Sequence, residues 1–370
     1  MEEKISLLLV TFGMHEPWVD ARITSFKALA TILSSKYDVT ILTTGPTEKS
    51  GYLNCINYAT VKTGDSLGWI RLLRRLVRQL RQKEYDFLIY RPYGGFNIKN
   101  FGFILLIRLI ALFKKVKIIL CLWGGPKGID WFSWLFTYVV IPIGKKEKGN
   151  LRIIAPVSFL SKINGKKEFK EMGDESSLKE HIGLFMYCTK DFDQASFNHV
   201  LYSRGLEDII KAAALLKDLN VKFMVSIPIF DDEIARDTLN EMLEKHDVRH
   251  KFILRGHIAN LENVFSDFDF YIFPLKTKTF FWLPLSVIEA FWSGVPVICT
   301  NIEPINLLIK NEKKCLLYEP GNYVELSEKI KSLAEDPLLR TSLRNEAWDF
   351  VREYYMPEDV LAKWELLLKP

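Results

Sequence analysis

Residues 283–300 read Leu283-Pro-Leu-Ser-Val-Ile-Glu-Ala-Phe-Trp-Ser-Gly-Val-Pro-Val-Ile-Cys-Thr300, and this stretch decides the fold of the second half of the chain. Pro284 suits the first turn of a helix, and Gly294 suits a helix end. The apolar run 296–300 then has the length of a buried strand. The stretch therefore predicts a helix that leads into a strand of a covered sheet, which is the building unit of an α/β domain.

The same alternation of buried strands and helices extends outward from this stretch in both directions. We expect further strands at 5–11, 39–44, 87–90, 116–122, 152–157, 182–188, 221–227, 251–254 and 268–273, with helical patterns between them. Strands that are apolar on both faces and separated by helices indicate parallel sheets covered on both sides. A polar stretch at 162–179 interrupts the rhythm, so the chain is expected to form two α/β domains. Their predicted ranges are 1–165 and 180–345, and the helices over 346–370 are expected to pack back on the first domain.

Length, charge and composition narrow the class of protein. The 370 residues suffice for two hydrophobic cores, and a net charge of +5 is too mild to suggest a nucleic-acid binder. Five scattered cysteines without a C-x-x-C pair are typical of reduced core residues. The start of the chain lacks the pattern of a secretory signal, and the apolar runs 101–113 and 131–143 are too short to span a bilayer. We therefore expect a cytoplasmic protein whose membrane contact, if any, is peripheral on the cytoplasmic face.

Glu289 is the first candidate for binding chemistry. The amino terminus of the helix that begins near Pro284 offers free N–H groups to an anion. Glu289 lies about one turn into this helix, where its carboxylate can accept two hydrogen bonds from a diol such as a ribose. The alternative is a buried glutamate that caps its own helix.

The stretch 283–297 resembles the donor-site signature of the group 1 retaining glycosyltransferases with the GT-B fold (glycosyltransferase family 4-like). Their pattern is E-G-(F or L)-(G or P)-L-x-(L or V)-x-E-A-(M or F)-x-x-G-x-P-V. In that family the second glutamate holds the nucleotide ribose, and Glu289 occupies its position. The first glutamate contacts the transferred sugar, and here Phe281 stands in its place. The resemblance implies two Rossmann-like, doubly wound parallel-sheet domains that face each other across a cleft.

Other segments resemble landmarks of the same family. Arg204, in Ser203-Arg-Gly-Leu-Glu-Asp, stands where a phosphate-binding lysine is usual, and an arginine can neutralise a diphosphate in the same way. Lys190 is the nearest basic residue to the family's preceding arginine. Gly256 and His257 resemble the turn that contacts the base. The resemblance also assigns Leu283, Leu285 and Ser286 to the donor site beside Glu289.

The amino-terminal half matches the family less closely. Gly13 resembles the first glycine-rich turn, where the backbone approaches the donor. Trp123 follows the strand that in many members ends in a histidine facing the sugar. No G-x-G-x-x-G follows the first strand, which argues against a Rossmann dehydrogenase.

The resemblance implies transfer of a hexose from a nucleotide-sugar donor with retention of configuration and without a metal or other cofactor. Arg204 and Glu289 would carry the reaction by holding the diphosphate and the ribose. The acceptor would be a glycolipid, a polyprenol-linked sugar or a polysaccharide. The alternative is a non-catalytic GT-B subunit that binds a nucleotide sugar or a partner glycosyltransferase, which Phe281 and Trp123 favour.

The stretch 71–83 is strongly basic and two-faced. It reads Arg-Leu-Leu-Arg-Arg-Leu-Val-Arg-Gln-Leu-Arg-Gln-Lys, and on a helix its apolar residues share one face and its arginines the other. The arginines either face water over a helix packed on the sheet or lie on a membrane of anionic lipid, where each basic residue adds roughly 1 kcal/mol.

Overall fold

The computed structural model describes residues 4–12, 21–45, 49–53, 56–62, 68–92, 98–122, 135–141, 147, 149–154, 180–187, 192–256, 258, 265–277, 284–303, 305–309 and 313–369. The chain divides into two compact units, one of Met1–Ile163 with Tyr354–Pro370 and one of Asn164–Glu353. The segment that returns to the first unit is therefore shorter than the expected 346–370. The reason is that helix α11 (Pro337–Tyr354) belongs to the second unit up to its last residue.

The amino-terminal unit is built on one mixed sheet, whose eight strands among the described residues follow the order β3-β4-β2-β1-β5-β6-β7-β8. The strands are β1 Ser6–Thr11, β2 Asp38–Gly45, β3 Lys49–Leu53, β4 Ile56–Lys62, β5 Phe87–Arg91, β6 Lys117–Cys121, β7 Tyr138–Ile141 and β8 Leu151–Ile153. Neighbours pair in parallel except β3 and β4, which pair antiparallel. The sequence did not predict this hairpin, because polar residues interrupt the apolar pattern of both strands.

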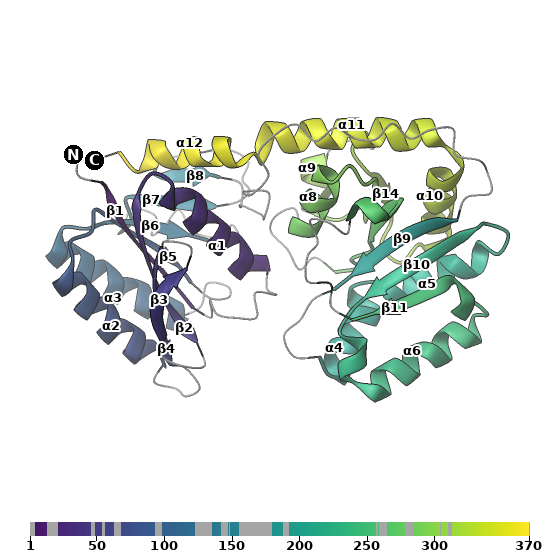
Figure 1. The fold of residues 1–370 in the computed structure, drawn as a ribbon, viewed down its shortest axis with the longest axis horizontal. Coiled ribbons are helices and arrows are strands. Elements are labelled where there is room, and N and C mark those ends of the chain that lie inside the picture. The colour runs from purple at the N-terminus through teal and green to yellow at the C-terminus, as the bar shows by residue number, and fades with distance from the viewer. Residues whose placement is uncertain are drawn as a thin grey trace. The chain divides into compact units, whose positions relative to one another are not determined.

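Helices cover both faces of this sheet (Figure 1). They are α1 Ala21–Ser34, α2 Gly68–Gln82, α3 Ile98–Lys114 and α12 Pro357–Leu367. Side chains alternate between the two faces along β1, as the pleat of a strand requires. Leu7 and Leu9 pack in the core that contains α1 and α12, whereas Leu8 and Val10 pack in the core that contains α2 and α3. The unit is therefore doubly wound, as expected.

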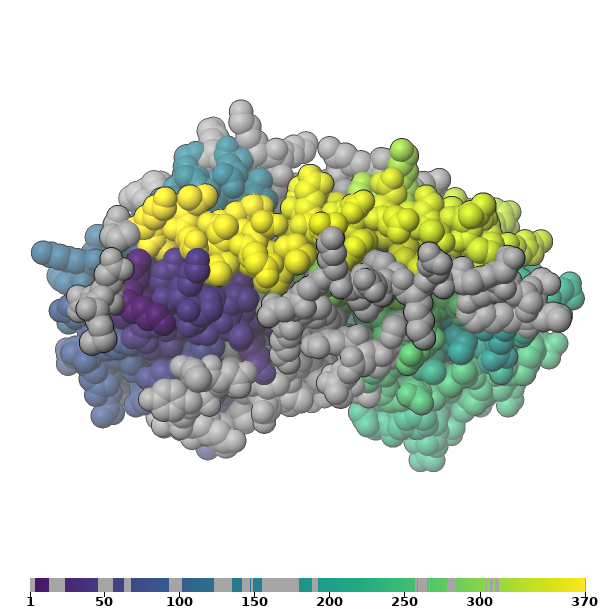
Figure 2. All heavy atoms as spheres, turned by 45° about the horizontal axis from the view of Figure 1, so that its top comes forward, coloured from purple at the N-terminus to yellow at the C-terminus, as the bar shows by residue number. Residues whose placement is uncertain are grey.

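Helix α12 completes the core of the amino-terminal unit from the far end of the sequence. Val360, Trp364 and Leu367 join the same cluster as Leu7, and Trp364 is only 2% exposed. An ion pair between Lys36 and Glu365 lies at the edge of this contact. Figure 2 shows α12 in yellow lying against the purple atoms of α1 on the surface of this unit.

The carboxy-terminal unit has a fully parallel sheet, described here as six strands in the order β11-β10-β9-β12-β13-β14. The strands are β9 His181–Met186, β10 Val221–Ser226, β11 Phe252–Arg255, β12 Phe270–Phe273, β13 Val297–Thr300 and β14 Leu316–Tyr318. The helices are α4 Gln194–Asn198, α5 Leu206–Leu215, α6 Glu233–Lys245, α8 Leu285–Trp292, α9 Ile305–Ile309, α10 Tyr323–Glu335 and α11. The strand order reverses between β9 and β12.

Two layers of helices flank this second sheet. One face buries apolar residues of α5, α6 and α10 in a single large cluster with the strands. Helix α8 contacts β12 and β13, and α11 packs on α8 through Trp292 against Trp348, whose ring centroids are 4.2 Å apart. Phe291 against Phe350 adds an edge-to-face contact at 6.3 Å. These contacts fix the position of α8, which carries the predicted donor-site residues.

Candidate functional site

The residues of interest in the carboxy-terminal unit gather where the strand order reverses between β9 and β12. Because all six described strands are parallel, their carboxyl ends meet at one edge of the sheet. Tyr187 follows β9 at this edge, and Pro274 to Lys276 follow β12. In open α/β sheets, ligands bind outside the carboxyl ends of the strands at such a reversal. The strand order therefore predicts a binding site at this edge.

Arg204 is braced at this edge by two aromatic neighbours. A π-helical turn, His199–Ser203, precedes it, and the Arg204 Nε donates a hydrogen bond of 3.2 Å to His199 Nε2. Its guanidinium lies over the Tyr187 ring, 4.9 Å from the centroid. Burial lowers the pKa of Arg204, and Tyr187 and Tyr271 act in the opposite direction. Because the ordinary pKa of arginine lies far above neutral, the guanidinium keeps its charge at pH 7. The result is a preorganised, partly desolvated cation.

His199 is held in the neutral form by the same arrangement. Burial lowers the pKa of His199, and the charge of Arg204 lowers it further. Its Nε2 can then accept the hydrogen bond from Arg204, while its ring contacts Tyr187 edge-on at 5.9 Å. His199 and Tyr187 escaped the sequence analysis because nothing local in the sequence marks them as neighbours of Arg204.

The position after Arg204 requires a glycine, Gly205. It has a left-handed backbone with φ of 78°. A Cβ at this position would lie 1.9 Å from the backbone oxygen of Pro274. Only glycine therefore lets the start of α5 approach the segment after β12 so closely. A hydrogen bond of 2.9 Å from the Lys276 N–H to the Ser203 oxygen closes the same junction.

Lys276 is a site residue that the sequence analysis missed. Its Nζ lies 2.6 Å from Asp208 Oδ1 and 3.2 Å from Glu207 Oε2, and the Asp208 side chain is only 1% exposed. Burial raises the pKa of Asp208 despite the nearby lysine. Burial alone would lower the pKa of Lys276, but hydrogen bonds and charges of Asp208 and Glu207 outweigh it and raise that pKa. The ion cluster ties the segment after β12 to the first turn of α5, directly beside Arg204.

Helix α8 presents Glu289 from a rigid support. Pro284 is the residue before the first turn, and Gly294, with φ of 74°, follows the helix end, as the sequence predicts. Ser286 accepts a hydrogen bond of 3.0 Å from the Tyr271 hydroxyl. Glu289 is buried and lies one turn after Ser286 on the same side of the helix. Glu289 lies just after the first turn of this helix.

The structure brings five of the predicted donor-site residues to the same unit. Arg204, Leu285, Ser286 and Glu289 lie on α8 or beside the start of α5. Gly256 follows β11 at the carboxyl edge, where its oxygen accepts a hydrogen bond of 3.1 Å from Ser226 Oγ. The remaining predicted residues, namely Gly13, Lys190, His257 and Leu283, lie outside the described residues, as do Phe281 and Trp123.

The amino-terminal unit has its own strand-order reversal, between β1 and β5. Arg91 ends β5 there and is buried. Its Nε donates a hydrogen bond of 3.2 Å to Thr11 Oγ1, and its guanidinium lies over the Phe26 ring at 4.7 Å. No sequence pattern predicts this buried cation, because Arg91 comes at the end of an apolar run, where a charged residue usually faces water.

The described residues contain neither a metal-binding cluster nor a membrane-spanning helix. Within them, no three histidine, cysteine, aspartate or glutamate side chains gather in a way that could hold a metal ion. No described helix is both long and apolar enough to cross a membrane. Cys121, Cys299 and Cys315 are buried free thiols.

Most of the second unit matches a known protein family. Residues 189–349, which include Arg204, Lys276 and Glu289, match the family model "Glycosyl transferases group 1". The chain is therefore similar to the group 1 glycosyltransferases over this range, and its two α/β units have the GT-B fold. A crystal structure of a glycosyltransferase from Rickettsia africae ESF-5 has the same fold, with a TM-score of 0.71, 14% identity and 99% of each chain covered.

Two curated relatives share part of the sequence. One is a poly(ribitol-phosphate) alpha-N-acetylglucosaminyltransferase of Staphylococcus aureus (strain COL), 26% identical over 166 residues, or 44% of this chain and 32% of the relative. The other is a UDP-Gal:alpha-D-GlcNAc-diphosphoundecaprenol alpha-1,3-galactosyltransferase of Escherichia coli, 23% identical over 121 residues, or 33% of this chain and 30% of the relative. The matched part of the chain thus spans about a third of the length of each relative.

Proposed function

We propose that this chain is a retaining hexosyltransferase that moves a sugar from a nucleotide-sugar donor to a glycolipid, polyprenol-linked or polysaccharide acceptor. The observation that carries the proposal is the braced, partly desolvated Arg204 at the carboxyl edge of a group 1 glycosyltransferase domain. Both curated relatives are named as glycosyltransferases, and one name contains a UDP-sugar donor and a diphosphoundecaprenol acceptor.

In this proposal the chain binds the donor and stabilises the leaving diphosphate. Arg204 neutralises the negative charge that grows on the diphosphate as the glycosidic bond breaks, and its aromatic supports keep it in place without reorganisation. The amino terminus of α8 adds free N–H groups, and Glu289 accepts hydrogen bonds from the ribose hydroxyls. No step requires a metal. Transfer that EDTA abolishes and manganese restores would contradict that part of the proposal.

Nucleotide titration of single variants tests the donor site. We expect UDP, GDP or ADP affinity to fall about 10- to 100-fold in Glu289→Gln and in Arg204→Gln, because each removes hydrogen bonds to a charged group worth roughly 1.5–3 kcal/mol. Glu244→Gln is the matched control, since Glu244 is exposed on α6. Unchanged affinity for every nucleotide in the Glu289 variant would refute the assignment.

A second candidate function is that of a non-catalytic subunit that binds a nucleotide sugar or a partner glycosyltransferase. The observation that favours it is Phe281 at the position where the family has a sugar-contacting glutamate. One measurement distinguishes the two candidate functions, namely the release of nucleoside diphosphate from the donor when acceptor is added. Only the transferase should release it. Tight donor binding without such release would favour the subunit.

We also propose that the protein is cytoplasmic and contacts the cytoplasmic face of an anionic membrane through 71–83. Helix α2 packs the apolar side of this stretch on the sheet through Leu72, Leu76 and Leu80. Arg74 and Arg78 are exposed on its other side. The contact that these arginines make with lipid headgroups would be electrostatic and therefore weakened by salt.

A further inference from the structure

Helix α3 carries an apolar stripe on the side that faces away from its own core. Leu106, Leu109 and Phe113 are 38%, 52% and 88% exposed. They are spaced by three and four residues, so they form one continuous ridge along the helix. Leu112, which is 55% exposed, widens the ridge near its end. A globular protein rarely leaves so much contiguous apolar surface in water unless something covers it.

The ridge is not required by the fold of the unit. The opposite side of α3 is the one that packs on the sheet, through Ile104, Ile107 and Ala111. Phe103 secures the start of the helix against Tyr90 and Phe12, with ring centroids 5.6 and 5.4 Å apart. The helix is therefore held rigidly by one face while the other stays free for an external contact.

Helix α2 lies beside α3 on the same face of the sheet (Figure 1). Its arginines place positive charge next to the ridge. Arg74, Arg78 and Arg81 are exposed and form no ion pair with any residue that the structure describes. Trp69, at the start of α2, is 46% exposed. Neither helix contains an aspartate or glutamate, whereas α2 has five arginines and α3 has three basic residues.

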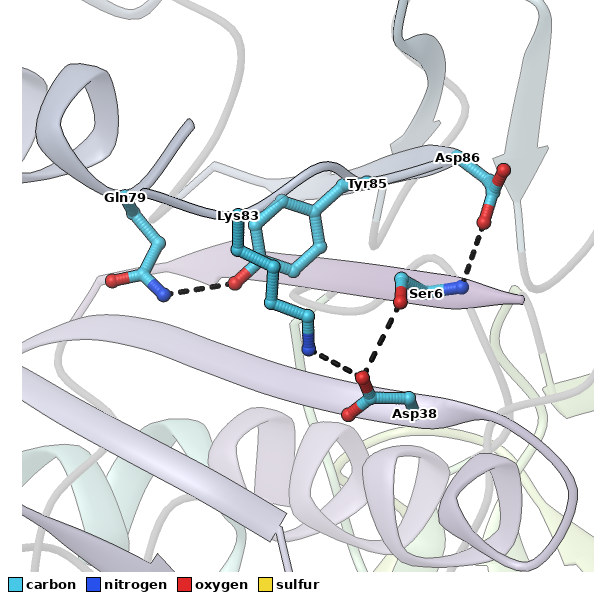
Figure 3. Close-up of polar contacts among 6 residues, drawn as sticks. All are labelled: Ser6, Asp38, Gln79, Lys83, Tyr85 and Asp86. Carbon is cyan, nitrogen blue, oxygen red and sulfur yellow. Dashed lines mark hydrogen bonds and ion pairs between the residues drawn. The ribbon is translucent and has the colours of Figure 1, made fainter. Parts of the chain in front are cut away.

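Lys83, which follows α2, is fastened to the sheet and does not belong to this surface (Figure 3). Lys83 forms an ion pair with Asp38, and Gln79 Nε2 donates a hydrogen bond of 2.8 Å to the Tyr85 hydroxyl. The Ser6 N–H donates one of 2.8 Å to Asp86. Lys83 is therefore engaged within the protein, and the outward charge of 71–83 comes from its arginines.

We propose that α3 is the element that enters a bilayer of anionic lipid, with the Leu106–Leu109–Phe113 ridge in the interfacial region and the arginines of α2 on the headgroups. One helix offers apolar side chains, the other offers cations, and neither contains a carboxylate. This combination complements a bilayer of anionic lipid better than a neutral surface. This inference rests on the membrane contact of 71–83 proposed above and adds α3 to it. It does not depend on the transfer reaction, because it uses the amino-terminal unit alone.

Flotation with vesicles of phosphatidylcholine, with and without phosphatidylglycerol, tests the inference on the full chain. We expect wild type to float with the anionic vesicles. The ridge variant Leu106→Gln/Leu109→Gln/Phe113→Gln should bind at least about tenfold more weakly at both low and high salt. The charge variant Arg74→Gln/Arg78→Gln/Arg81→Gln should lose mainly the salt-sensitive part of binding.

The matched control removes exposed apolar side chains elsewhere. Ile234→Gln/Leu338→Gln changes residues that are 70% and 81% exposed in the other unit and should float like wild type. Equal flotation of wild type and the ridge variant overturns the inference, and so does the absence of wild-type flotation. If wild type does not float, and light scattering shows that it is a dimer while the ridge variant is a monomer, the ridge binds a second copy of the chain and the inference is overturned. Nucleotide titration of each variant shows separately whether its donor site still binds.

Discussion

Replacing Lys276 by methionine should destabilise the carboxy-terminal unit far more than an ordinary surface change. The substitution keeps the length of the side chain and removes the ammonium group 2.6 Å from Asp208. Asp208 is 1% exposed, so it would be left as a buried charge without its main partner. Removing one partner of a buried pair costs about 3–5 kcal/mol. Lys276 itself is 22% exposed, so we expect a loss of roughly 3 kcal/mol at neutral pH.

The loss should depend on pH with a definite sign. Burial already raises the pKa of Asp208, and removal of the lysine raises it further. The folded variant then binds a proton that the unfolded chain lacks above its ordinary carboxyl pKa of about 3.9. The deficit of the variant relative to wild type is therefore full above the folded pKa and shrinks as the pH falls through it.

Urea unfolding followed by tryptophan fluorescence measures this loss in the transition of the carboxy-terminal unit. Lys211→Met is the matched control, because Lys211 forms only a partly exposed i,i+4 pair with Glu207 and should cost about 0.3–0.5 kcal/mol. The double variant Lys276→Met/Asp208→Asn should regain part of the loss, since it removes the buried charge as well. If Lys276→Met costs no more than Lys211→Met, or if its deficit grows at low pH, the reasoning about this cluster is refuted.

Two further substitutions probe how other elements are held in place. Gly205→Ala should lower the free energy of unfolding by more than the roughly 1–2 kcal/mol that a left-handed backbone costs, because the new Cβ would also displace Pro274. Nucleotide titration should then show weaker binding, since Arg204 directly precedes this glycine. The control Gly321→Ala has a similar φ of 82° but open space around it, so an equal effect on binding would contradict the close-approach argument. Trp364→Ala should destabilise the amino-terminal unit by about 3–5 kcal/mol in thermal unfolding, since Trp364 is buried in its core, whereas the exposed neighbour Leu366→Ala should change little.

Local sequence patterns predicted the elements around the site, because proline, glycine and apolar spacing act over a few residues. The stretch 283–300 predicted a helix and a strand, and the structure has them at Leu285–Trp292 and Val297–Thr300. The same stretch identified Glu289, and the Arg204–Gly205 pair pointed to the start of α5. The amphipathic spacing of 71–83 likewise predicted the buried side of α2.

Tertiary structure alone decided which distant residues meet. Lys276 reaches Glu207 across 69 positions of sequence, and no local pattern marks a lysine that will lie between two carboxylates. The β3–β4 hairpin and the docking of Trp364 on the first unit depend in the same way on pairing between remote segments. Helix α3 is the clearest case, because it is apolar nearly all round and reads as a core helix. Only the packing on the sheet decides which side of α3 is exposed. The side with Ile104 packs on the sheet, and the side with Phe113 remains exposed.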